Sequence, residues 1–281
     1  MQPYTYTILP ASPSLSAWVE SIFIIDVDLK SLSLPAVLKY PWSVTTRIYF
    51  VISGGHLMVK QNEASDFSVY PENFVVGPRL ENNIIDLGPY RRVAGITFKP
   101  GGLYRLLGIP MQEFAKELDL NLVIKETREL SEQLLHAQND NEVFGKIEKF
   151  LLRRLPDIKP MTPFDKAVEM LAASNGSLPI SKVAEFASLS MRQFERKAIV
   201  SLGVSPKLYS RVLRFTNAWL YREAHPDISW YRITHEFGYA DQMHLVDDFK
   251  IFCGTTPTGI SEQIAAKMLT GIEGRLNVQV C

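Results

Sequence analysis

A stretch that occurs twice decides the fold of this chain: VAEFASLSMRQFERKAIVSLGVSP at residues 183–206 and ITHEFGYADQMHLVDDFKIFCGTTP at residues 233–257. Each copy passes from a short apolar-periodic segment through a tight break into a second amphipathic segment. Each then closes on Gly-x-Ser/Thr-Pro, so that Gly203 corresponds to Gly254. Two helices joined by a short turn, with the second able to lie in a groove, form the helix-turn-helix pattern of DNA-binding proteins. The duplication therefore predicts two such units.

The segment between the copies predicts a long connecting helix, because Leu208, Val212, Phe215 and Trp219 mark one apolar face of residues 206–223. Such a helix would set the separation of the two units. The helical part is expected to open at Thr162-Pro163, with Thr as N-cap and Pro at the first helical position. The remaining expectations are N-caps at Ser190 and Asp227, groove-binding helices at Met191–Leu202 and Asp241–Phe252, and a closing helix at Pro257–Met268.

Residues 1 to about 100 predict short strands rather than helices. The runs Arg47–Ile52 and His56–Lys60 flank Ser53-Gly54-Gly55 and are typical of a hairpin. Many short strands at close spacing favour an antiparallel barrel or sandwich. Further strands are expected at Ile22–Val27, Phe67–Tyr70, Asn73–Val76, Ile84–Leu87 and Val93–Phe98.

Beyond Pro100 the apolar period becomes helical, and these helices are expected to pack back on the strands. The predicted fold class is α+β: an N-terminal antiparallel β-barrel or sandwich with helices of its own, then an all-α part of two helix-turn-helix units joined by a long helix. The expected domains are a sensory domain (1–156), a linker (157–163), a DNA-binding domain (164–270) and a tail (271–281).

Composition excludes several classes of protein. The chain has 30 basic and 30 acidic side chains, and the two signs are nearly equal in residues 161–281, so attraction to DNA must come from local placement of charge. The sequence contains no run of about 18 apolar residues, so no membrane span is predicted. The N-terminus lacks the pattern of a secretory signal. Cys253 and Cys281 are not expected to pair, which favours a reducing, cytoplasmic location.

The sequence does not favour an enzyme. A metal site in a β-barrel needs two or three histidines with a carboxylate, but the first 160 residues contain only His56 and His136, far apart. Neither a nucleophile elbow nor a phosphate-binding loop is found. We therefore expect no catalytic residues, no metal and no cofactor.

Taken together, residues 162 to about 268 resemble the DNA-binding domain of the AraC/XylS family of transcription regulators. The N-terminal half resembles the sensory domain of one branch of that family, through Val76-Gly77-Pro78, Phe98-Lys99-Pro100-Gly101-Gly102-Leu103 and Gly108-Ile109-Pro110. The residues that carry the C-terminal resemblance are Ala184, Ser190, Phe194, Arg196, Gly203-Val204-Ser205-Pro206, Tyr209, Arg214, Ala218, Ile233, Gly238-Tyr239, Asp241-Gln242, His244, Phe249-Lys250 and Gly254-Thr255-Thr256-Pro257.

The resemblance implies sequence-specific DNA binding by both units in adjacent major grooves. It also implies an N-terminal domain that binds an effector or self-associates. The expected partners are double-stranded DNA, a small-molecule effector, a second copy of the chain in a homodimer, and RNA polymerase if the protein is an activator; no membrane partner is expected.

Side chains expected to face bases share the outer faces of the two groove-binding helices. Arginine can pair bidentately with guanine, glutamate can accept from cytosine, glutamine can read adenine, and an apolar side chain can meet the thymine methyl group. An ordinary solvated helix face is the alternative for each. The candidates are Arg192, Gln193, Glu195 and Arg196 on the first helix, and Gln242, Met243, Val246 and Asp247 on the second.

Phosphate contacts are expected near helix N-termini, where backbone N–H groups point outward. The candidates are Ser190, Lys207, Arg211, His244 and Thr256. Simple helix capping is the alternative for Thr256, and an exposed structural histidine is the alternative for His244. The candidates for an effector pocket inside the barrel are Trp42, Tyr49, Phe50 and Phe98, with plain core packing as the alternative.

The chain departs from the family pattern in its recognition helices. Asp247 stands where the family has arginine, Ala198 where it has phenylalanine, and Thr234 where it has a small alanine. A carboxylate at 247 would meet phosphate repulsion unless it accepts from a cytosine. We therefore expect the first unit to supply most of the base reading. The alternative is a regulator-derived module that acts through protein contacts with weakened or lost DNA binding.

Overall fold

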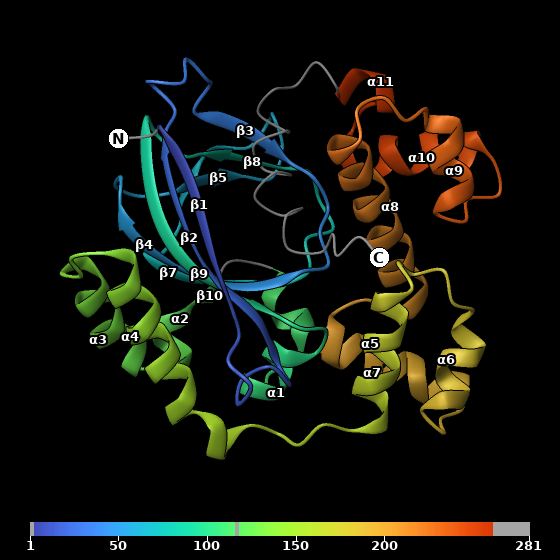
Figure 1. Cartoon of the computed structure of the whole chain (residues 1–281), viewed down its shortest axis with the longest axis horizontal. Helices are drawn as coiled ribbons and strands as arrows, with labels where there is room; N and C mark the ends of the chain where they lie inside the picture. The colour runs from blue at the N-terminus through green and yellow to red at the C-terminus, as the bar shows by residue number, and fades with distance from the viewer. Residues whose placement is uncertain (1–2, 116–117, 261–281) are drawn as a thin grey trace.

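The computed structural model describes residues 3–115 and 118–260 (Figure 1). An antiparallel, sheet-rich region (residues 3–157, the sheet region) is followed by a helical region (residues 163–260), which confirms the predicted α+β class. The closing helix predicted to Met268, the domain end at 270, the tail 271–281 and Cys281 extend beyond the described residues.

Two open antiparallel sheets form the sheet region, so the sandwich is found and the closed barrel is not. The larger sheet has the order β1-β2-β9-β4-β7-β10 and the smaller one the order β3-β8-β5-β6. The strands are β1 Tyr4–Pro10, β2 Val19–Asp28, β3 Val37–Tyr40, β4 Thr46–Ser53, β5 Met58–Lys60, β6 Ser68–Val69, β7 Asn73–Val76, β8 Asn83–Asp86, β9 Tyr90–Phe98 and β10 Leu118–Asp119.

The hairpin predicted around Gly54-Gly55 is wrong. β4 pairs with β7 and β9 in the larger sheet, whereas β5 pairs with β6 and β8 in the smaller one. Gly54 and Gly55 have φ values of 106° and 76°, and they carry the chain from one sheet to the other. A Cβ on Gly54 would lie 2.2 Å from the Tyr90 carbonyl oxygen, so this passage requires glycine.

The larger sheet is apolar on both faces because both are covered. Ile22, Ile24 and Phe50 are buried on the face that meets the helices, whereas Phe23 and Ile25 are buried toward the smaller sheet. Figure 1 shows α3 and α4 beside the larger sheet, and their apolar stripes belong to the same core. The helices of this region are α1 Gly102–Leu107, η1 Met111–Ala115, α2 Leu120–Val123, α3 Glu126–Leu135, α4 Asp140–Arg153 and η2 Leu155–Asp157.

The helical region contains the two predicted helix-turn-helix units. The capping box at Thr162 and the N-cap at Ser190 are confirmed. The N-cap predicted at Asp227 is wrong, because Ser229 caps the following helix and its Oγ accepts from Arg232 N at 3.3 Å. The helices are α5 Pro163–Ala173, α6 Ile180–Phe186, α7 Met191–Leu202, α8 Pro206–Ala224, α9 Trp230–Glu236, α10 Gln242–Cys253 and α11 Pro257–Ile260.

The long helix α8 belongs to both units, as Figure 1 shows. Tyr209 and Leu213 are buried in the core of the first unit, while Phe215 and Trp219 are buried in the core of the second. Since residues three and four apart share a helix face, one helix can serve two cores on different sides. Helix α8 therefore contributes buried side chains to the cores of both units.

Candidate nucleic-acid interface

The first recognition helix, α7, exposes the side chains that the sequence placed outward. Arg192, Glu195 and Arg196 are exposed, while Phe194 and Ala198 are fully buried beneath them. None of the three exposed charges forms an ion pair with a residue that the structure describes. This face therefore presents two cations and one carboxylate to an incoming ligand.

Gln193 and Ser190 are occupied by a capping box at the start of α7. Ser190 N donates to Gln193 Oε1 at 2.9 Å, and Gln193 N donates to Ser190 Oγ at 3.3 Å. A base contact by Gln193 would compete with this box, because the side-chain oxygen is already an acceptor. Its side-chain amide nitrogen, Nε2, remains for a ligand.

On the second recognition helix, α10, the outward candidates are exposed except for Val246, which is half-buried. Leu245 and Phe249 are fully buried below them. Asp241 caps this helix by accepting from His244 N at 2.9 Å, and that hydrogen bond holds the pKa of Asp241 below its usual value. His244 Nδ1 lies 3.0 Å from Asp241 Oδ2, so the ring is oriented toward the cap.

Asp248 is buried and paired with Arg211, whereas its neighbour Asp247 is exposed. Arg211 Nε and Nη2 donate to Asp248 Oδ1 at 3.0 and 2.6 Å. Burial raises the pKa of Asp248, and Arg211 opposes that rise. The surface of α10 is consequently less acidic than its sequence suggests, because one of the two carboxylates is turned inward.

A hollow of about 910 Å³ lies between the two units. It brings together three predicted phosphate contacts, Lys207, Arg211 and His244, with the predicted base contact Asp247. Two further cations line it, Arg214 and Lys250, which were not among the predicted phosphate contacts. The spacing Lys207, Arg211, Arg214 places three cations on one side of α8 and was the signal that could have found Arg214.

The other two predicted phosphate contacts lie outside this hollow, each at a helix start. Ser190 caps α7, and Thr256 Oγ1 accepts from Gly259 N at 3.2 Å at the start of α11. Both therefore have a capping role, which leaves phosphate binding by them a prediction.

The four aromatic residues predicted to line an effector pocket lie in three separate places. Phe50 and Phe98 belong to the core between the larger sheet and its helices. Tyr49 lies between the two sheets, where its ring stacks on Phe74 at 5.1 Å. Trp42 lies at the junction with the helical region, with its ring 5.2 Å from that of Phe252. The structure does not bring the four together.

The sheet region contacts the C-terminal ends of both recognition helices. Trp42 N donates to the carbonyl of Phe252 near the end of α10 at 2.9 Å. At the end of α7, a Cβ on Gly203 would lie 2.9 Å from Pro78 Cγ. Val44, between these contacts, packs against the cores of both units. The predicted base contacts begin at the opposite, N-terminal ends, but Arg196 also lines a hollow of about 410 Å³ together with Tyr104 and Arg105 of the sheet region.

A cavity of about 250 Å³ opens at the same junction, lined by residues that include Pro78, Arg79, Met111 and Gly203. The guanidinium of Arg79 stacks over the Tyr40 ring at 4.6 Å. Its Nη1 is buried and has no hydrogen-bond partner among the described residues. A molecule in this cavity would touch the sheet region and the end of α7 at once.

Replacing Gly203 by alanine tests this docking, with Gly238 as the matched control. Both glycines have positive φ, 78° and 66°, so alanine at either position costs about 1 kcal/mol of backbone strain. Only at Gly203 would the new methyl group meet another part of the chain. We expect Gly203→Ala to lower the free energy of unfolding by about 1–3 kcal/mol more than Gly238→Ala. Equal losses in urea titrations would contradict the docking.

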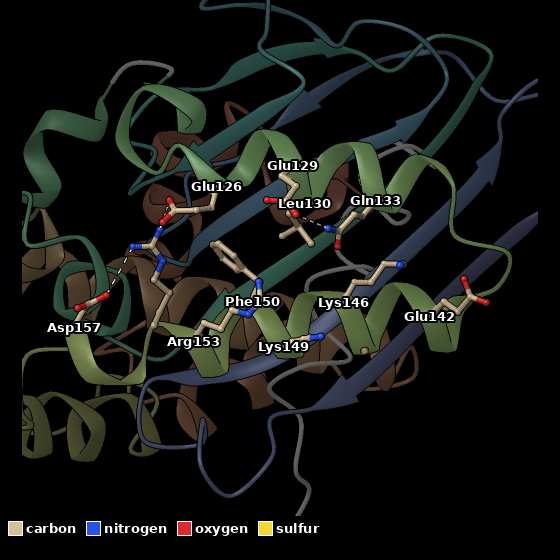
Figure 2. Close-up of a pocket in the computed structure, with 12 residues that line it drawn as sticks. Glu126, Glu129, Leu130, Gln133, Glu142, Lys146, Lys149, Phe150, Arg153 and Asp157 are labelled. Atoms are coloured by element: carbon tan, nitrogen blue, oxygen red, sulfur yellow. Dashed lines mark hydrogen bonds and ion pairs between the residues drawn. The ribbon is translucent and has the colours of Figure 1, made fainter.

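A second surface, the groove between α3 and α4, has a volume of about 430 Å³. Figure 2 shows Glu126 and Glu129 on the α3 side and Lys149 and Arg153 on the α4 side. Arg154 Nη2 donates to Glu126 Oε2 across the groove at 2.6 Å. Gly145 is exposed in the middle of α4, and a Cβ there would meet no atom within 4 Å. A mid-helix glycine costs about 1 kcal/mol relative to alanine, and nothing within the described chain requires it.

Within residues 3–115 and 118–260, no cluster of three or more His, Cys, Asp and Glu side chains has the arrangement of a metal site. Among the described helices, none has both the length and the apolar character needed to cross a membrane.

Comparison with known proteins gives a family match for the sheet region alone. Residues 7–118 match a family model described as Domain of unknown function (DUF6597). No curated protein matches the chain by sequence.

Solved structures with a similar course of the chain include ToxT from Vibrio cholerae. An apo variant of ToxT from strain SCE256 has 14% identity and a TM-score of 0.49, with 91% of this chain and 99% of that chain covered. Wild-type ToxT of that strain with a bound unsaturated fatty acid has 12% identity and a TM-score of 0.47, covering 86% and 94%. A variant of 2-hydroxyethylphosphonate dioxygenase has 13% identity and a TM-score of 0.25, covering 74% and 46%. The functional proposal therefore rests on the side chains of this chain.

Proposed function

We propose that this protein is a sequence-specific DNA-binding transcription regulator of the AraC/XylS type. Both helix-turn-helix units would bind adjacent major grooves of double-stranded DNA, as the resemblance of residues 162–268 implies. In this proposal the sheet region is a sensory domain, the helical region is the DNA-binding domain, and the protein works in the cytoplasm without catalysis.

The observation that carries the proposal is the hollow between the units. Lys207, Arg214 and Lys250 bring three cations there against the single exposed carboxylate of Asp247, since Asp248 is paired with Arg211. The chain has no net charge, so this local excess is what would attract the phosphate backbone between two adjacent major grooves. The exposed cations of α7 add to it.

Regulation would act through the junction. Trp42 and Pro78 contact the ends of α10 and α7, and the cavity beside Arg79 and Gly203 offers space for a small-molecule effector. An effector that prefers one arrangement of the junction would shift the population of DNA-competent molecules. We therefore propose this cavity as the effector site, in place of the pocket predicted from the four aromatic residues.

Self-association would use the α3–α4 groove. Its acidic and basic sides could pair with the opposite sides of a second copy, and Gly145 would permit a close approach of two helices. A homodimer would present four helix-turn-helix units to DNA. RNA polymerase is a further partner if the protein is an activator.

The alternative proposal is a regulator-derived module that works through protein contacts. Asp247 favours it, because this exposed carboxylate lies in the hollow that would face phosphates. The two proposals differ in whether DNA binds at all.

A gel shift with genomic fragments at about 50 and 200 mM salt separates the two proposals. If the protein neutralises about six phosphates, affinity should fall about 10³-fold between these salt levels, because bound cations release counterions from the DNA. A retained protein–DNA band at low salt that disappears at high salt supports the regulator proposal. Absence of any retained band at 50 mM salt would favour the protein-interaction module.

A further inference from the structure

Arg214, near the middle of α8, holds both helix-turn-helix units at once. Its Nη2 donates to the carbonyl of Gly176, which lies between α5 and α6 in the first unit, at 3.1 Å. Its Nη1 donates to the carbonyl of Gly238, in the turn of the second unit, at 3.3 Å. The guanidinium also lies over the Tyr239 ring at 5.5 Å. One side chain thus connects the two units across the hollow.

The two carbonyls are held in place by independent features. At Gly176, φ is +72° and a Cβ would lie 2.4 Å from the Ser210 carbonyl oxygen, so the first unit approaches α8 as closely as glycine allows. The Ser210 hydroxyl donates to the same Gly176 carbonyl. At Gly238, φ is +66°, which turns the chain between α9 and α10. Arg214 therefore joins two rigid turns rather than two mobile loops.

The geometry of arginine suits this connection better than that of lysine. Its planar guanidinium presents several N–H groups in a fixed fork, whereas lysine carries a single rotatable ammonium group. Two acceptors on different units fix the fork in position and orientation.

We propose that Arg214 is a positioning residue that sets the separation of the two recognition helices and thereby the spacing of the two DNA half-sites. Two helices that enter successive major grooves must lie about 34 Å apart, one helical turn of DNA. Packing on α8 and contacts with the sheet region hold each unit, and Arg214 adds a direct connection between the turns of the two units. In this proposal the added connection fixes the tilt of one unit against the other, so the protein accepts one spacing and rejects others. This inference rests on the proposed function.

The spacing test uses an operator selected from genomic or random DNA by the full-length protein. Variants of that operator carry insertions of one, two and five base pairs between the half-sites. Wild-type protein should lose about tenfold or more in affinity with a two-base-pair insertion. Arg214→Met should bind the original operator more weakly and should discriminate between spacings by only about twofold, since its units can adjust to either site.

Arg222 supplies the matched control, because it lies on the same helix and makes similar contacts within one unit. Its guanidinium lies over the Trp230 ring at 5.6 Å and donates to the carbonyl of His225 at 3.5 Å. Arg222→Met should keep the wild-type spacing discrimination. Arg214→Lys should keep more stability than Arg214→Met, yet it should lose most of the discrimination because a rotatable ammonium group lacks the fixed fork that orients the two turns.

A distance measurement without DNA tests the same connection independently. Spin labels at Lys182→Cys on α6 and Arg232→Cys on α9, both exposed positions, report the separation of the units. The background carries Cys281→Ser, and burial raises the pKa of Cys253, which slows its reaction with the label. The distance distribution should broaden in Arg214→Met and stay narrow in Arg222→Met.

The outcomes separate the inference from the proposed function. If wild-type protein retains no DNA while the distance distribution still broadens only in Arg214→Met, the positioning role stands and DNA binding fails. If wild-type protein binds DNA and Arg214→Met shows unchanged spacing discrimination, the positioning role is overturned. Equal weakening at every spacing, with an unchanged distance distribution, would likewise overturn it, because a purely structural or phosphate-binding role predicts that result.

Discussion

The double substitution Arg192→Ala/Arg196→Ala is expected to abolish operator retention while leaving the thermal midpoint within a few degrees of wild type. A bidentate contact between arginine and a base contributes about 1–3 kcal/mol of discrimination. Loss of two such contacts predicts a decrease in affinity of about 100-fold or more, since about 1.4 kcal/mol corresponds to tenfold. Both side chains are exposed and support no buried contact, so the fold should persist. Gel shifts and thermal melts measure the two effects.

The matched control for this variant removes two exposed cations of the sheet region that lie outside the α3–α4 groove, Lys125 and Arg128. Their replacement by alanine changes the net charge equally but leaves α7 intact. It should reduce DNA affinity by no more than a few-fold. Unchanged retention in Arg192→Ala/Arg196→Ala would remove α7 from the DNA interface, whichever way the control behaves.

Phe249→Ala is expected to give the largest loss of stability, about 3–5 kcal/mol, because a fully buried aromatic side chain leaves a cavity that its neighbours cannot fill. Phe249 is 0% exposed, and its ring lies 4.9 Å from that of Phe215 and 5.0 Å from that of Trp230. It therefore joins α10 to α8 and α9. Urea titration followed by tryptophan fluorescence should report the loss, because Trp219 and Trp230 lie in this core.

Phe186→Ala is the comparison for that loss, since this phenylalanine at the end of α6 is 51% exposed. We expect a change of less than about 1 kcal/mol, the usual range for a surface position. If the two substitutions had similar effects, Phe249 would not be the centre of the second core.

The helical region was predictable from the sequence because its signals are local. Ser190 and Gly203 bracket α7, and the sequence predicted the bounds of that helix as the structure shows them. The apolar face predicted for α8 through Val212, Phe215 and Trp219 is the one buried in the second core, whereas Tyr209 and Leu213 of the first core were not predicted. Asp227 was misassigned as an N-cap because serine and aspartate are about equally favoured caps, and both stand before Trp230.

The sheet region was less predictable because its pairing is non-local. The run Arg47–Ile52 was predicted to pair with the next run along the chain, His56–Lys60. In the structure it pairs with β7 and β9 instead. Tyr49 and Phe50 are adjacent in the sequence and lie on opposite faces of the sheet, since side chains alternate along a strand. An effector pocket that includes both was therefore incompatible with a strand at this position.

The site was predictable residue by residue but not as an arrangement. The sequence named Lys207, Arg211 and His244 separately, and only the packing of α10 against α8 shows that they share one hollow. The same packing buries Asp248 against Arg211. Asp248 stands three residues after Leu245 and four before Phe252, so helical periodicity could have identified it as the inward carboxylate.

The position of Val44 between the two helical cores has a consequence for how the protein unfolds. A single residue of the sheet region is packed in both units, so loss of either core exposes surface in the other half of the molecule. Heating should therefore give one cooperative transition rather than three separate ones. A protease cut within residues 157–163 should leave two fragments that still migrate together in gel filtration.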